Sequence, residues 1–133
     1  MSGSDKAYGN MWKDHNDSVI SLVFKRIEHS EYAPYICPEC GQRSLHIYMQ
    51  LHNADTRRGG LWIWCSDCRR FCHCSHYIPL EWENASCIEP EKLCAVPDYL
   101  DKLKDEIDGH LNMQIRQREM VSGNFHLLYT GAL

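Results

Sequence analysis

The fold is decided by two short cysteine pairs, CPEC at residues 37–40 and CSDC at residues 65–68, which are separated by 24 residues. In each CxxC turn both sulfurs can reach one metal ion, and two such turns supply the four ligands of tetrahedral zinc. Four thiolates leave no open coordination position, which is typical of a structural site. We therefore predict one structural Zn²⁺ ion, held by Cys37, Cys40, Cys65 and Cys68.

The residues between and after the two pairs predict a small antiparallel sheet. At 44–52 apolar and polar residues alternate, as in a half-buried strand. NADTRRGG at 53–60 has the composition of a turn, and LWIW at 61–64 indicates a second strand. A third strand is expected at 70–78, ended by Pro79.

The order CPECG, hairpin, CSDC resembles the zinc-ribbon superfamily over residues 35–78, about a third of the chain. The resemblance implies a zinc-stapled sheet but identifies no particular family and no function, because ribbons serve many roles.

The flanking segments are harder to assign. We expect residues 1–17 to be a flexible N-terminal segment, since they are polar and contain two glycines. SVISLVFKRIE at 18–28 is β-branched and apolar, and a strand is the first interpretation. A short helix capped by Asp17 or Ser18 is the alternative, because the apolar residues also fit helical spacing.

A C-terminal helix is predicted to begin at Pro97. Its apolar stripe comprises Leu100, Leu103, Ile107 and Leu111. The predicted fold is therefore α+β: a zinc-ribbon-like antiparallel sheet of three to four strands with this helix packed on it, in a domain at 18–111. Residues 112–133 are predicted to be a tail, with a strand at 124–130 as an alternative.

Aromatic and basic side chains on the hairpin suggest a binding surface. Trp62 and Trp64 lie on one face of their strand, and Arg57 and Arg58 lie at the predicted hairpin tip, with Tyr48 on the preceding strand. Tryptophan and arginine are common interface anchors. The alternatives are that the tryptophans form part of the core, or that the surface stacks single-stranded nucleic acid.

The charge distribution restricts the partners. The chain has a formal net charge of −4. Residues 81–133 carry a net charge of −5, and the rest of the chain carries +1. General nucleic-acid binding is disfavoured by this acidity. There is no run of 18 apolar residues and no apolar leader at the N-terminus, so we expect a cytoplasmic protein with no membrane partner.

The remaining cysteines leave a question open. Cys72, Cys74 and His76 lie on one face of the third predicted strand, where Cys87 or Cys94 would complete a second metal site. The alternative is that Cys72 and Cys74 are small buried apolar residues. The sequence carries no recognisable catalytic motif, so we do not expect an enzyme.

The sequence favours a small zinc-binding protein that acts as a protein–protein interaction module, with a bacterial immunity or inhibitor protein as a special case. Two alternatives remain: a nucleic-acid-binding zinc-ribbon protein, and a thiol-dependent or metal-dependent enzyme.

Overall fold

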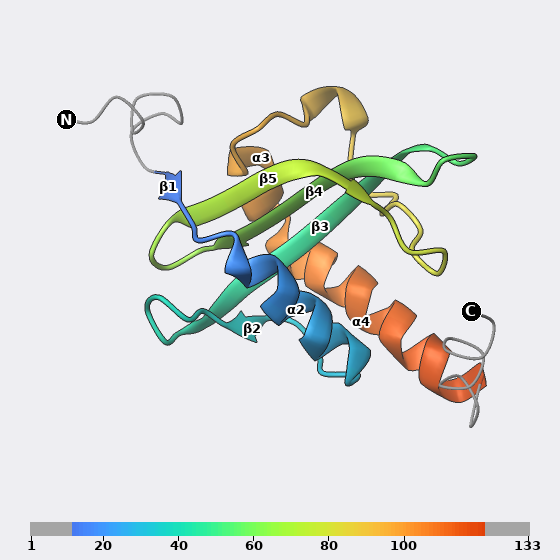
Figure 1. The fold of residues 1–133 in the computed structure, drawn as a ribbon, viewed down its shortest axis with the longest axis horizontal. Coiled ribbons are helices and arrows are strands. Elements are labelled where there is room, and N and C mark those ends of the chain that lie inside the picture. Colours follow the sequence, from blue (N-terminus) through green and yellow to red (C-terminus); the bar gives the residue numbers. More distant parts are fainter. Residues whose placement is uncertain (1–11, 122–133) are drawn as a thin grey trace.

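The computed structural model describes residues 12–121, which form a five-stranded sheet with helices on both faces (Figure 1). The strands are β1 (Lys13–Asp14), β2 (Tyr35–Ile36), β3 (Arg43–Asn53), β4 (Arg58–Cys65) and β5 (Arg70–Tyr77). The helices are α2 (Ser18–Glu28), α3 (Asp98–Lys102) and α4 (Lys104–Val121), with a 3-10 turn η1 (Pro90–Lys92).

The strand order is β1-β5-β4-β3-β2. The pair β1–β5 is parallel and the other pairs are antiparallel. The predicted α+β class, with a C-terminal helix on the sheet, is confirmed. The three predicted strands correspond to β3, β4 and β5, and two-residue strands are added at both edges. Of these, β1 pairs in parallel and so makes the sheet mixed rather than purely antiparallel.

One face of the sheet is largely aliphatic and is covered by α2 (Figure 1). The pairing register places Ile47, Ile63 and Cys72 side by side on this face. Helix α2 contributes the buried Val19 and Val23.

The strand interpretation of residues 18–28 is therefore wrong, and the helical alternative is correct. Apolar residues spaced three and four apart gave α2 one face to bury, and that spacing outweighed the β-branched composition. The predicted side-chain cap is absent at Asp17; instead the Asn16 side-chain oxygen accepts a hydrogen bond from the Ser18 N–H at 2.8 Å.

The opposite face of the sheet is aromatic and lies against the C-terminal part of the chain. The indole N–H of Trp64 donates to Asp101 of α3 at 3.0 Å, and that of Trp62 donates to the Cys94 carbonyl at 2.8 Å. His46 lies 2.9 Å from Asp108 of α4. These directional bonds fix how the helices sit on the sheet, because each buried polar group needs its partner.

The turn of the main hairpin is shorter than predicted. Strand β4 begins at Arg58, so Gly59 and Gly60 belong to the strand. A Cβ atom at Gly59 would lie 2.1 Å from the Gln50 carbonyl oxygen, so glycine there allows two backbones to approach closely. The left-handed turn conformation is adopted by Arg57, at φ 57°.

Both ends of the described chain are more regular than expected. Helix α4 extends to Val121, beyond the predicted limit at residue 111. Trp12 is 2% exposed and β1 pairs with β5, so residues 12–17 pack on the sheet although 1–17 was predicted to be flexible. The alternative strand at 124–130 lies outside the described residues.

Asp101 allows a test of how α3 is held. Burial would raise the pKa of Asp101, but hydrogen bonds from Ser66, Trp64 and Arg69 hold it below its ordinary value. We expect Asp101→Ala to lower the free energy of unfolding by about 2 kcal/mol, since three donors lose their acceptor.

The measurement is urea unfolding with metal in excess. The control is Asp55→Ala at the exposed hairpin turn, where a change within about 0.5 kcal/mol is expected. Equal losses for the two variants would contradict this account of the aromatic face.

Candidate metal centre

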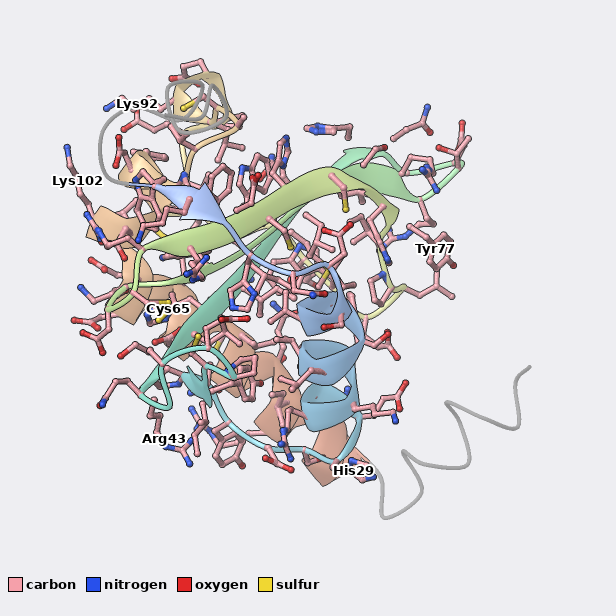
Figure 2. The ribbon with its side chains drawn as sticks, turned by 60° about the vertical axis from the view of Figure 1, so that its left-hand side comes forward. His29, Arg43, Cys65, Tyr77, Lys92 and Lys102 are labelled. Atoms are coloured by element: carbon pink, nitrogen blue, oxygen red, sulfur yellow. The ribbon has the colours of Figure 1, made fainter. Side chains whose placement is uncertain are left out.

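The four predicted ligands meet at one end of the sheet. Cys37 and Cys40 lie in the turn between β2 and β3, whereas Cys65 is the last residue of β4 and Cys68 lies in the turn that leads to β5. The two turns become neighbours because β3 and β4 pair, with Leu45 directly opposite Cys65. Figure 2 labels Cys65, and the other three cysteines of the cluster have their Sγ atoms within 4.8 Å of its sulfur.

The sulfur geometry is that of a tetrahedral metal site. All four Sγ atoms lie within 4.8 Å of one another. The Sγ atoms of Cys37 and Cys68 are 3.8 Å apart, and those of Cys40 and Cys65 are 3.6 Å apart. An ion with sulfurs at about 2.3 Å places them about 3.8 Å apart in a tetrahedron. A disulfide requires about 2.05 Å, so these contacts are not disulfide bonds.

The two cysteine turns have the same backbone conformation. The Gly41 N–H donates to the Cys37 carbonyl at 2.8 Å, and the Arg69 N–H donates to the Cys65 carbonyl at 3.1 Å. Both residues are left-handed, with φ of 78° and 60°. The second turn also directs the Cys68 N–H at the Cys65 sulfur, at 3.5 Å. Donors aimed at sulfur stabilise a thiolate.

The thiols of the cluster have unequal proton affinities. Burial raises the pKa of Cys65 far above its ordinary value and that of Cys68 to about 11. A backbone hydrogen bond from Gln42 holds the pKa of Cys40 below its ordinary value. Without a cation, Cys65 and Cys68 keep their protons near pH 7, so metal binding must release protons and strengthen as pH rises.

A histidine that the sequence analysis passed over lies against the cluster. His15 Nε2 is 3.5 Å from the Cys37 sulfur, and the side chain is 5% exposed. Burial lowers the pKa of His15, so the ring is neutral near pH 7. His15 precedes Cys37 by 22 residues in a region without a motif, so no spacing pattern could have identified it.

The aromatic residues predicted to form a partner-binding surface are buried instead. Trp62 is 3% exposed, and Trp64 and Tyr48 are fully buried. Their positions on one sheet face were correct, but α3, α4 and the loop before them cover that face. The binding role predicted for these three residues is therefore wrong, and the alternative that the tryptophans belong to the core is correct.

The two hairpin arginines have different environments. The Arg57 guanidinium donates to the carbonyls of Ile78 and Pro79, so it ties the hairpin turn to the loop after β5. Arg58 is exposed and reaches the Ser75 hydroxyl at 3.4 Å. Within the predicted binding set, Arg58 is therefore exposed, Arg57 is half-buried, and the three aromatic residues are buried.

Within residues 12–121, the four-cysteine cluster is the one group of three or more His, Cys, Asp or Glu side chains close enough to share a metal ion. Cys72, Cys74 and His76 therefore do not form a second site there with Cys87 or Cys94. Burial raises the pKa of the Cys72 thiol to about 12, which suits a buried apolar residue and not a nucleophile.

Comparisons with known proteins add no assignment. No protein-family profile matches the chain, and no curated protein or solved structure shows significant similarity to it. No helix among the described residues is both long and apolar enough to span a bilayer. The functional argument therefore depends on the site itself.

Gly41 adopts the left-handed conformation of the first cysteine turn, whereas Gly109 is helical, so alanine should affect stability differently at these two positions. At Gly41 a Cβ atom would contact nothing within 4 Å, but φ is 78°. We expect Gly41→Ala to lower the free energy of unfolding by about 1–2 kcal/mol, through backbone strain alone. The measurement is chemical unfolding of the metal-saturated protein.

The matched control is Gly109→Ala within α4, where a Cβ atom also meets open space. There alanine should raise the free energy of unfolding by roughly 0.5–1 kcal/mol, because it is the better helix former. The same sign of effect at both glycines would contradict the assigned turn conformation.

Proposed function

We propose that this chain is a small zinc-binding protein whose single zinc ion is structural. The observation that carries the proposal is the packing of four cysteine sulfurs, from two matching turns, at the spacing of a tetrahedral ion. A tetrahedral set of four thiolates favours zinc or iron–sulfur chemistry among the common metals. Four protein ligands saturate zinc, so no position is open for substrate, and the proposed protein is not an enzyme at this site.

The proposed role of the zinc follows from its place in the fold. The ion would join the start of β3 to the end of β4, and these two strands form the centre of the sheet. Ser44 adds a link between the same two turns, since its hydroxyl donates to Asp67 and its carbonyl accepts from the Ser66 N–H. Zinc would therefore stabilise the scaffold while other side chains bind partners.

We further propose that the scaffold serves as a protein-interaction module for a basic partner. Of the nine acidic residues between 81 and 108, Asp98, Asp101 and Asp108 are used internally by Trp12, Trp64 and His46. The other six are exposed: Glu81, Glu83, Glu89, Glu91, Asp105 and Glu106. Such a surface attracts positively charged proteins and repels nucleic acid. An immunity or inhibitor role stays a prediction from the sequence.

The zinc proposal is tested by metal content. We expect one zinc per chain in the wild type and near-complete loss of zinc in Cys40→Ser, together with a large loss of thermal stability, because metal binding and folding are coupled. The measurement is elemental analysis combined with calorimetry. The control is Cys87→Ser, an exposed cysteine outside the cluster, which should leave both values unchanged.

A folded, metal-free wild type would end the zinc proposal. Stoichiometric iron in place of zinc would assign the site to a different metal.

The partner proposal requires a different measurement. A basic partner isolated from the native host should bind more weakly as salt rises, and Glu91→Gln combined with Glu106→Gln should weaken binding several-fold. The control is Glu28→Gln with Asp55→Asn, which removes two exposed acidic groups elsewhere. Equal weakening by both double variants would show that net charge alone, and not this surface, is responsible.

A further inference from the structure

The N-terminal segment at 12–17 contacts both cysteine turns. The Lys13 N–H donates at 2.9 Å to the carbonyl of Arg69, the residue that follows Cys68. The Arg69 guanidinium in turn lies 4.2 Å from the centre of the Trp12 ring. At its other end, the segment places His15 Nε2 3.5 Å from the sulfur of Cys37. One short segment therefore bridges the two halves of the metal centre.

The two ends of this segment are supported differently: Trp12 is buried in the core and packs edge-on against Phe71, whereas His15 lies beside the cysteine cluster. A hollow of about 580 Å³ borders it, lined by Asp14, Asn16 and Asp17 on one side and by β5 residues on the other. Other hydrogen bonds run from the His15 N–H to the Phe71 carbonyl, from the Trp12 indole to Asp98, and from the Arg70 guanidinium to the Asp14 carbonyl. The Trp12 end is thus held by the core, and the His15 side chain depends more on its contact with the cysteine turn.

We propose that His15 belongs to the metal centre as a hydrogen-bond donor to Cys37, and that metal binding fastens the segment at 12–17 onto the sheet. This inference rests on the proposed zinc site. A metal-bound sulfur has lost its proton, so it can only accept a hydrogen bond, and the His15 Nε2 that faces it at 3.5 Å must be the donor. A bond to an ionised acceptor is roughly twice as strong as one to a neutral acceptor.

Loss of the metal would weaken the docking of this segment. Without the ion, the metal–sulfur bonds that join the two cysteine turns are absent, and the turns are linked only by the Ser44 bonds to Asp67 and Ser66 and by the pairing of β3 with β4. The Arg69 carbonyl and the Cys37 sulfur are then less firmly positioned, so the segment is held less firmly at Lys13 and His15. Because α2 begins at Ser18, three residues after His15, its first turn loosens with the segment. Metal occupancy would thus control how firmly one layer of the fold is docked.

Two substitutions at His15 distinguish a hydrogen-bond donor to Cys37 from a side chain that only fills space. His15→Phe keeps a ring at this buried position but removes the N–H. His15→Gln replaces the ring but places an amide N–H near the position of Nε2. A merely structural role favours Phe, whereas the proposed role favours Gln. His15→Leu gives a second donor-free variant with a smaller side chain, and His52→Ala, at an exposed histidine, serves as the control.

The first readouts are zinc affinity by chelator competition and the sulfur-to-metal charge-transfer band of the Co²⁺-substituted protein. We expect His15→Phe and His15→Leu to weaken zinc binding on the order of 10-fold, as is typical when a hydrogen-bond partner of a ligand is removed. Their charge-transfer band should move to lower energy, because the thiolate loses its donor. His15→Gln and His52→Ala should stay near the wild type.

The third readout is amide exchange at Lys13 and His15, whose N–H groups bond to Arg69 and Phe71. We expect protection in the zinc-loaded wild type and its loss in the zinc-free protein and in zinc-loaded His15→Phe. Unchanged affinity, band and protection in the donor-free variants would overturn the role of His15 and leave the zinc site standing. A wild type that takes up neither Zn²⁺ nor Co²⁺ would overturn the proposed zinc site and this inference together.

Discussion

Four cysteine sulfurs within 4.8 Å of one another are the constraint on which the rest of this structure depends. Sulfurs this close and largely buried cannot all be ionised unless a cation lies among them, because like charges at this spacing repel strongly in a low-dielectric environment. The cluster sits where β3 and β4, the central pair of the sheet, meet their neighbours. Whatever occupies it therefore sets the geometry of the turns on either side.

The two faces of the sheet depend on that central pair in different ways. The aliphatic face buries α2 through non-directional apolar contact. The aromatic face holds the C-terminal helices through specific bonds, such as Trp64 to Asp101 and His46 to Asp108. Arg69 links the cysteine cluster to the aromatic face. It follows Cys68 in the second cysteine turn, and it forms an ion pair with Asp101 of α3 at 3.0 Å. The metal site and the docking of α3 are thus mechanically connected.

Local sequence predicted the features that local chemistry controls. The CxxC spacing identified all four sulfurs of the cluster, and alternation identified β3. Features that depend on three-dimensional neighbours were missed. Trp62 and Trp64 were placed on the correct face, but whether that face is exposed depends on helices more than 30 residues away. Gly59 was assigned to a turn, whereas its role is to admit the Gln50 carbonyl.

Residues 18–28 and His15 show two further features that could not be predicted from the sequence alone. An 11-residue apolar segment fits both strand and helix spacing, and the tertiary structure decides, because the sheet face needed a covering layer. His15 has no motif at all and becomes part of the site only because β1 carries it there.

We therefore propose a scaffold whose stability depends on a zinc ion at the four-cysteine cluster and whose partner contacts lie elsewhere on the surface. The most direct test of the central claim is X-ray absorption at the zinc edge on the chain purified without added metal. The account predicts a single zinc shell of four sulfurs at about 2.3 Å. A shell containing nitrogen or oxygen ligands, or an absence of bound zinc in the folded protein, would contradict it.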